Sequence, residues 1–333
     1  MKLTTRGIIN TILFVFLGSL PFLTDWMGDS FYTGLTSRIL ILAIAATSLN
    51  LLIGYGGMVS FGHAAYIGIG AYVVGIGAFH AFEDGIDWML NGYVQLIAAL
   101  LASALIALII GAISLRTHGV YFIMITMAFS QMLYFTAVGI ETYGADDGLT
   151  IYARSDMLGL IDLNDEKSLY YLIFFSLVFV LYFMHRLIGS EFGAVIRGSR
   201  SNEARMRAIG FSPYKYRLVA FVIAGTIAGY AGFLMANLSD FVSPSILHWT
   251  RSGDLIIMIV LGGIGNLFGP LYGAIAFVML EELLSSIPLT IGGLSVGEYW
   301  QLIFGPLLIF VVLYARNGID SFLPGARKNH DGA

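Results

Sequence analysis

The chain has 333 residues, of which 58% are hydrophobic and only 11% are charged. Soluble domains carry about 25% charged residues, so this chain lacks the polar surface of a water-soluble globule and is predicted to be a membrane protein. It contains no cysteine, which excludes disulfides, thiolate zinc sites and a cysteine nucleophile. Its net charge of −4 argues against nucleic acid as a partner, because phosphates call for a basic surface.

Continuous apolar segments dominate the chain, and a helix needs roughly 20 such residues to cross a bilayer. They lack the alternation of a membrane β-barrel and are predicted as helices. The stretch over 250–286 is broken at Gly262 to Asn266 and is predicted as two more spans. We expect an all-α, polytopic membrane helical bundle of about ten spans, forming one transmembrane domain over residues 1–333. The other eight segments are 8–24, 37–53, 62–82, 93–115, 119–140, 169–188, 217–238 and 298–315.

Charge predicts the orientation, because basic residues near span ends stay in the cytoplasm. The connection after the sixth segment is strongly basic, whereas the odd-numbered connections are acidic. This pattern predicts that both termini are cytoplasmic. The first segment is expected to be retained, because Leu20 to Asp25 lacks the small residues of a signal-peptide cleavage site. The basic connection holds Arg186, Arg197, Arg200, Arg205, Arg207, Lys215 and Arg217.

A glycine-rich stretch follows the second segment. Four glycines fall between positions 54 and 62, close to Asn50, Ser60 and His63. Backbone that leaves regular helix at membrane depth is tolerated beside a protected cavity, which suits a translocation path. The alternative is that the later glycines only allow close helix crossing, and that a neutral His63 hydrogen-bonds a backbone carbonyl.

The basic connection contains a candidate short helix. Ser201 or Asn202 can cap a helix over 203–209, which Gly210 and then Pro213 end. A helix this short is marginal in water, so we expect it to dock, either on the span ends or on a soluble partner. The apolar residues Ala204, Ile209 and Phe211 are predicted to fill a groove. A solvated loop that only sets topology is the alternative.

A few charges lie near the broken 250–286 stretch. Arg251, Asp254, Glu281 and Glu282 suit proton relay or cation binding if they are deep in the membrane, and an interfacial position is favoured. No two histidines have the spacing of metal ligands, and no catalytic triad or nucleotide-binding loop is visible. The sequence therefore predicts neither a metal site nor catalysis.

Several motifs together make the chain resemble the permease subunits of branched-chain amino-acid ABC importers, specifically the LivM-like half. The resemblance runs from about residue 37 to 315. It is carried by the motifs over 49–57, 60–65, 115–122, 241–244 and 261–266.

The resemblance implies an assembly. Glu203, Ala204 and Gly210 match the coupling helix, at about 201–211, that sits in a cleft of the ATPase subunit; Arg205 and Arg207 share its position. The implied partners are a LivH-type permease, two ABC ATPase subunits that hold ATP and Mg, an extracytoplasmic substrate-binding protein and membrane lipid.

The resemblance also implies a location and further site residues. The chain is expected to be a multi-pass protein of a bacterial or archaeal inner membrane, without a cofactor of its own. An outer motif over 142–149 departs from the family pattern by a tyrosine and one extra residue, and is predicted to place Asp146 and Asp147 where the binding protein docks. The predicted translocation path comprises Asn50, Tyr55, Ser60, His63, Gly262, Gly263 and Asn266.

Two alternatives remain at this stage. A urea or short-amide importer belongs to the same broad family, and its path needs neutral donors and acceptors. A stand-alone ion-coupled transporter needs no coupling helix and uses a buried carboxylate such as Asp254, Glu281 or Glu282. An intramembrane enzyme is a distant third, for want of paired catalytic groups.

Overall fold

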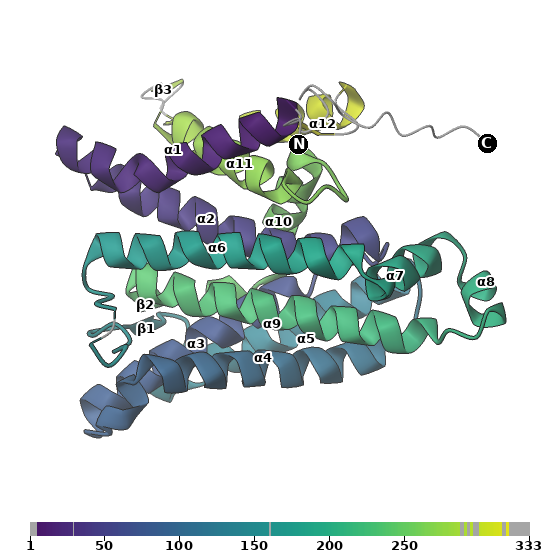
Figure 1. Cartoon of the computed structure of the whole chain (residues 1–333). Helices are drawn as coiled ribbons and strands as arrows, with labels where there is room; N and C mark the ends of the chain where they lie inside the picture. The colour runs from purple at the N-terminus through teal and green to yellow at the C-terminus, as the bar shows by residue number, and fades with distance from the viewer. Residues whose placement is uncertain are drawn as a thin grey trace.

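The computed structural model describes residues 5–28, 30–159, 161–286, 290–291, 294–295, 300–314 and 318–319. Most of these residues are helical, and the long helices run side by side as a bundle (Figure 1). The α-helices are α1 (Thr5–Met27), α2 (Phe31–Asn50), α3 (His63–Glu83), α4 (Gly92–Ser114), α5 (Val120–Val138), α6 (Glu166–Gly189), α7 (Glu191–Ser201), α8 (Glu203–Ala208), α9 (Pro213–Ser239), α10 (Trp249–Gly262), α11 (Gly269–Ser285) and α12 (Trp300–Tyr314). A π-helical turn, η1 (Leu51–Tyr55), extends α2, and short 3₁₀-helices occupy Asp87–Leu90, Glu141–Tyr143 and Pro244–Leu247.

The predicted apolar segments all fall on helices. Within the part of the chain that the structure describes, seven helices are long and apolar enough to cross a membrane, namely α1, α2 with η1, α3, α4, α5, α6 and α9. The break predicted within 250–286 is present, and it separates two shorter helices, α10 of 14 residues and α11 of 17. The last predicted segment is α12, of 15 residues.

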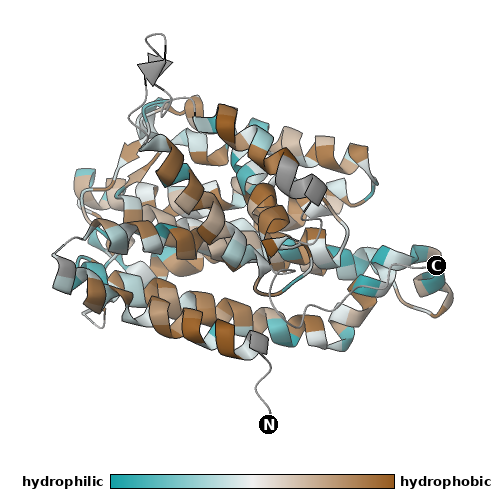
Figure 2. Ribbon diagram, turned by 90° about the horizontal axis from the view of Figure 1, so that it is seen from above, coloured by the Kyte–Doolittle hydropathy of each residue, from teal (hydrophilic) through white to brown (hydrophobic). Residues whose placement is uncertain are grey.

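The centre of the bundle combines small and polar residues with large apolar ones such as Ile44 and Phe221, and further large apolar residues cover its outside. Helices α2, α3 and α9 pack at its centre, and buried polar side chains such as Ser103, Asn237 and Ser252 lie among them. On α4, Ile97, Leu101 and Leu105 form an exposed stripe at helical spacing. This distribution suits a protein whose outer surface meets lipid, because close helix contact in membranes depends on small residues. Figure 2 shows the hydrophobic residues along the long helices and hydrophilic residues gathered toward the ends.

The crossing of α3 and α9 illustrates why the chain uses so much glycine. A Cβ atom added at Gly70 would lie 1.9 Å from the carbonyl oxygen of Gly229, and one at Gly232 would lie 1.9 Å from that of Ile67. The two backbones therefore touch, and no larger residue fits between them.

Helix α10 begins deep in the bundle. The hydroxyl of Ser130, near the middle of α5, donates to the carbonyl of Leu247 at 2.7 Å. The chain thus enters from one end as strand β2 (Phe241–Val242) and a 3₁₀ turn before α10 starts. At 1.5 Å per residue, α10 covers only about 21 Å, less than a bilayer core.

Two small antiparallel sheets lie outside the helices. Strand β1 (Leu149–Thr150) pairs with β2, with Leu149 opposite Val242, and β3 (Thr290–Ile291) pairs with β4 (Leu294–Ser295). Beside β1 and β2, Arg154 donates to both carboxylate oxygens of Asp240 at 2.8 Å. The hydrogen bond to Asp240 raises the pKa of Arg154, and this outweighs burial, which disfavours the charged guanidinium. The β1–β2 end lies opposite the end that carries α7 and α8 (Figure 1).

Candidate functional site

Helix α8 forms as its end signals predict. Asn202 is the N-cap, and its side-chain oxygen accepts from the backbone N–H of Arg205 at 2.9 Å. The chain leaves the helix through Gly210 at φ +92°, a conformation that L side chains rarely adopt. Pro213 then begins α9. The capping residue, the helix and its stop predicted at 201–211 are therefore all present.

Helix α8 is attached to the rest of the chain on one side only. Met206 is its one buried residue, and Gly198 of α7 lies against it. Ala204, Ile209 and Phe211 are exposed, with Ile209 63% accessible. We call these three residues, Ala204 in α8 and the other two in the turn that follows it, the apolar face of α8. Phe211 packs edge to face against Tyr216 of α9, so the end of that helix covers part of this surface, whereas Ile209 stays open to a second protein.

Glu203 ties α8 to the start of α9. Its carboxylate accepts from Arg217 of α9 at 2.7 Å and from Arg207 at 2.5 Å. Burial of the Glu203 carboxylate disfavours its charge, but the hydrogen bond from Arg207 and the charges of Arg217 and Arg207 outweigh this, so the pKa of Glu203 is lowered. Glu203 is therefore ionised at neutral pH. Arg217 also donates to the carbonyl of Ser199 in α7 at 2.9 Å, so this one guanidinium holds α7, α8 and α9 together.

Arg200 of α7 makes a second tie, to the end of α2. Its guanidinium donates to the carbonyl of Gly54 in the π-helical turn η1. Its aliphatic carbons lie against Gly57, which has a φ of +68°. A π-helical turn leaves carbonyls without their usual helical partners, and such turns are frequent at functional sites. Arg200 thus connects the α7–α8 segment to the point where α2 leaves regular geometry.

The two predicted helix breaks meet at this point. The Asn50 side chain accepts from the N–H of Gly265 at 3.0 Å and donates to the carbonyl of Asn266 at 2.9 Å. A Cβ atom at Gly54 would lie 2.6 Å from the Gly265 nitrogen, so the two backbones are in contact. We call Asn50, Gly54, Gly265 and Asn266 the joint between α2 and the α10–α11 turn.

The remaining predicted path residues lie around the joint or one step away from it. Gly262 and Gly263 are buried beside Gly269 at the start of α11, and Tyr55 is half-buried at the end of η1. Ser60, just before α3, and His63, its first residue, are also buried, and His63 contacts Ser48 of α2, two residues before Asn50. In this conformation the glycines, Ser60 and His63 pack against protein, and their part in a translocation path stays a prediction.

His63 adopts a single hydrogen-bonding arrangement. Its Nε2 lies 2.8 Å from the hydroxyl oxygen of Ser48, and that hydroxyl donates to the carbonyl of Ala45 at 2.7 Å. Because the Ser48 hydrogen is used, His63 must donate from Nε2, leaving Nδ1 as an acceptor with no partner among the described residues. The partner is a hydroxyl instead of the expected carbonyl, and the bond fixes α3 against α2.

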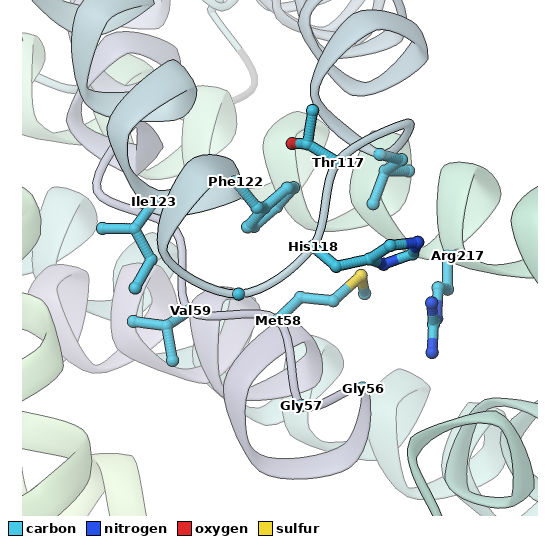
Figure 3. A pocket seen from close by; sticks show the side chains of 11 residues that line it. Gly56, Gly57, Met58, Val59, Thr117, His118, Phe122, Ile123 and Arg217 are labelled. Carbon is cyan, nitrogen blue, oxygen red and sulfur yellow. The ribbon is translucent and has the colours of Figure 1, made fainter. Parts of the chain in front are cut away.

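Two of the motifs that carry the family resemblance border one cavity at the α7–α8 end. The loop Gly56 to Val59 faces the connection between α4 and α5, with Arg217 alongside (Figure 3). The cavity has a volume of about 150 Å³. The side chains of Met58 and His118, which both line it, lie next to each other and extend toward Arg217 (Figure 3). Arg217, which binds Glu203, therefore also lines the cavity between the first helix break and the α4–α5 connection.

The predicted outer motif lies at the opposite end of the bundle. Asp146 and Asp147 are exposed in a tight loop before β1. The loop is held by Gly144, where a Cβ atom would lie 1.9 Å from the carbonyl oxygen of Gly148. It presents two carboxylates to solvent, and their docking role stays a prediction.

Sequence reasoning missed three arginines that the structure makes central. Arg200 and Arg217 counted only as topology signals, because nothing local shows that they reach Gly54 and Glu203. Arg38 lies inside a predicted span, where an ionisable residue is a functional hypothesis by default, and that signal was available. It pairs with Glu281 of α11 at 3.0 Å.

The candidate site consists of hydrogen bonds and ion pairs between helices and has no set of reactive groups among the described residues. The described residues contain no cluster of three or more histidine and carboxylate side chains that could hold a metal ion. The features that the sequence singled out converge instead on helix ends and on the segments between them.

Comparison with known proteins identifies the family. Residues 31–312 match the family model described as branched-chain amino acid transport system, permease component. The chain is 26% identical over 303 residues to the high-affinity branched-chain amino acid transport system permease protein LivM of Escherichia coli (strain K12), covering 84% of this chain and 68% of that protein. It is 24% identical over 310 residues to the probable LivM permease of Methanocaldococcus jannaschii, covering 83% and 89%.

A match to the companion permease type is also present. The chain is 24% identical over 185 residues to the probable branched-chain amino acid transport permease protein LivH of M. jannaschii, covering 54% of this chain and 55% of that protein. No solved structure matches the chain. With a family model that covers most of its length and LivM proteins among its relatives, the chain belongs to the permease component family of branched-chain amino acid transport systems.

Proposed function

We propose that the chain is the permease subunit of an ATP-driven ABC importer that moves branched-chain or related amino acids by alternating access. The observation that carries this proposal is α8, a capped helix that projects its apolar face and is tied by Glu203 and Arg200 to two helices of the bundle. A short exposed helix of this kind needs a partner to be stable. A stand-alone transporter has no use for it.

The proposed topology has ten spans across a bacterial or archaeal inner membrane. Both termini lie in the cytoplasm. The basic residues around α7 and α8 and the acidic connections at the opposite end support this orientation. Helix α10 is short, and we propose that it completes a crossing together with the 241–248 segment that precedes it. The whole chain then forms one transmembrane permease domain with a coupling helix.

The proposed partners follow from the two ends of the bundle. Two ATPase subunits, which hold ATP and Mg, take up the apolar face of α8 and its counterpart on a LivH-type permease. A substrate-binding protein docks on the opposite side, where Asp146 and Asp147 are exposed. The match to both LivM and LivH proteins supports pairing of two related permeases.

The proposed mechanism uses the ties of α8 to move helix ends. Displacement of α8 pulls on Glu203 and hence on Arg217 and α9. It also moves α7, and with it the Arg200 contact to Gly54 at the joint. Opening the joint separates α2 from the α10–α11 turn, and this exposes the predicted path residues from Asn50 to Asn266. Alternating access of this kind is a shift between two packed arrangements.

The apolar face of α8 gives a direct test of the ATPase partner. Ile209→Asp is expected to reduce co-purification of the ATPase subunits with this chain at least ten-fold, because it places a carboxylate in the docked interface. The measurement is affinity purification from membranes in mild detergent with quantification of each subunit. The matched control is Leu158→Asp in the connection between β1 and α6 at the opposite end of the bundle, where the leucine is 64% accessible and lies outside the membrane-spanning helices. ATPase recovery that is unchanged in Ile209→Asp would contradict the docking assignment.

The hydrogen bond between Arg200 and the Gly54 carbonyl gives a test of how movement of α8 reaches the joint. Arg200→Met keeps the aliphatic packing on Gly57 and removes the bond to the Gly54 carbonyl, so we expect uptake to fall about ten-fold while ATP hydrolysis by the assembled complex continues. Both rates are measured in proteoliposomes. The control is Arg197→Met on the same helix, which removes only a bond to the carbonyl of Ile188. Equal loss of uptake in both variants would show that the joint is not the element moved.

A further inference from the structure

Four ionisable side chains lie together on three helices that pack on one another, α2, α10 and α11. One nitrogen of Arg38 on α2 donates to both carboxylate oxygens of Glu281 on α11, at 3.3 and 3.0 Å. Arg251 and Asp254 follow in the first turns of α10, which packs against both α2 and α11. We call Arg38, Arg251, Asp254 and Glu281 the charge cluster.

The charge cluster lies within the apolar length of the bundle. Helix α10 begins level with the middle of α5, as the bond from Ser130 to Leu247 shows, and Arg251 and Asp254 lie beyond that point. Arg38 is seven residues into α2, about 10 Å along the helix axis from Phe31. Arg251 and Asp254 are therefore deeper than the interfacial position that the sequence favours.

These side chains are accessible in the isolated chain. The exposed fraction is 54% for Arg251 and 35% for Asp254. A charged side chain at the bilayer centre costs about 2.5–3.5 kcal/mol on insertion scales, and such residues face a protein interior or a water-filled cavity. The lipid-exposed stripe of α4 is purely aliphatic by comparison. The α2–α10–α11 face is thus turned away from lipid in the assembled protein.

The two ion pairs of the charge cluster differ in whether their charged groups can still bind another ligand. Arg38 and Glu281 form a close pair that uses both carboxylate oxygens. Arg251 and Asp254 are 3.6 Å apart, longer than a hydrogen bond, so each retains capacity for another ligand. They lie three residues apart on one helix, and a guanidinium beside a carboxylate matches the carboxylate and ammonium that an amino acid carries on one carbon atom. Arg251 is also in the first turn of α10, where the helix dipole favours an anion.

We propose that Arg251 and Asp254 bind the carboxylate and the ammonium of the transported amino acid, with Arg38 and Glu281 fixing the charge balance beside them. The substrate path then runs along the α2–α10–α11 face, closed on its other side by the second permease. This inference rests on the proposed import function and adds the groups that recognise the substrate. A neutral substrate such as urea needs neither charge.

The first test uses the absence of native cysteine. Leu42 is half-buried one turn after Arg38 on the same face of α2, so in the assembled complex Leu42→Cys is expected to react with a charged methanethiosulfonate reagent. Leucine is expected to slow the labelling at least five-fold, whereas 4-methylpentanoate, isoamylamine and urea leave it unchanged. Labelling is read on this chain by mass spectrometry. The control is Leu105→Cys on the lipid-exposed stripe of α4, which is expected to stay unlabelled.

Two outcomes would overturn the proposal. One is a Leu42→Cys variant that resists the reagent while the complex still imports amino acids, which would place the path elsewhere and leave the import function standing. The other is equal protection by leucine and by urea, which would remove the charge recognition. Failure of the import function itself would appear separately, as absent ATP-driven uptake by the unmodified complex.

A second test separates binding from structural support. Asp254→Asn is expected to lower leucine uptake at least ten-fold, and Asp254→Glu to keep most of it, with subunit recovery unchanged in both. The double variant Arg38→Met with Glu281→Met removes a complete ion pair, which is often tolerated when both charges leave together. It is expected to retain leucine protection of Leu42→Cys, whereas Asp254→Asn abolishes it. Protection that persists in Asp254→Asn would overturn the assignment.

Discussion

Glu203→Arg is expected to abolish ATP-driven uptake. The substitution places a third cation beside Arg207 and Arg217, which now share the Glu203 carboxylate at 2.5 and 2.7 Å. Only the bond from Arg217, which is largely buried, joins α8 to α9; a hydrogen bond to a charged group contributes about 1.5–3 kcal/mol, and Glu203→Arg removes it. The measurement is substrate uptake into proteoliposomes containing ATP, with the recovered amount and thermal midpoint of the complex as checks on folding.

A charge exchange provides the control for this prediction. Glu203→Arg combined with Arg217→Glu restores one opposite-charge pair across α8 and α9, and we expect partial recovery of uptake. Normal uptake by Glu203→Arg alone would remove the role of α8 as the coupling element. Uptake lost in the single variant and in the exchanged pair alike, with ATPase subunits still bound, would show that the carboxylate acts at this position through a different partner.

Gly70→Val is expected to prevent recovery of folded protein. A Cβ atom must keep about 3.0 Å from its neighbours, and at Gly70 it would lie 1.9 Å from the Gly229 carbonyl oxygen, so α3 and α9 would have to separate by roughly 1.1 Å. Overpacking usually costs about 1–3 kcal/mol, and here the obstacle is backbone that cannot rotate away. Separation would also disturb the neighbouring contact between Gly232 and Ile67.

The matched control is Gly34→Val in α2, where a Cβ atom meets nothing within 4 Å. Size-exclusion profiles and thermal midpoints in detergent compare the two variants with the parent. We expect a monodisperse peak for Gly34→Val and aggregated or absent material for Gly70→Val. A normal midpoint for Gly70→Val would mean that the α3–α9 crossing is looser than its geometry indicates.

Local patterns predicted the elements well. Apolar runs placed the long helices, the glycines at 54–62 and 262–266 marked the breaks, and Asn202 with Gly210 bounded α8. Each of these depends on residues a few positions apart. The depth at which α10 begins was not predicted, because hydropathy counts apolar residues and is blind to whether 241–248 enters as helix or as extended chain.

The contacts that define the candidate site are separated too far along the chain for such patterns. Asn50 and Gly265 are 215 residues apart, and Arg200 and Gly54 are 146 apart. Asn50 and Gly265 were each flagged within a helix break, but nothing in either segment indicates that the two breaks share hydrogen bonds. Arg200 looked like one more basic residue of a cytoplasmic loop. The packing of α2 against α10 and α11 brings Asn50 to Gly265, and the packing of α7 against η1 brings Arg200 to Gly54.

The central position of α2 has a consequence for biosynthesis. In its most apolar stretch, 89% of the residues of α2 with η1 are buried inside the protein. Nevertheless, α2 is the second helix to leave the ribosome. The ion-pair partner of Arg38 is Glu281, which is translated 243 residues later. At about 5–20 residues per second that interval lasts roughly 12–50 s. During that time a span carrying an unpaired arginine and an unpaired asparagine must be sheltered by the insertion machinery, so the order of synthesis makes nascent α2 a natural client of a membrane chaperone.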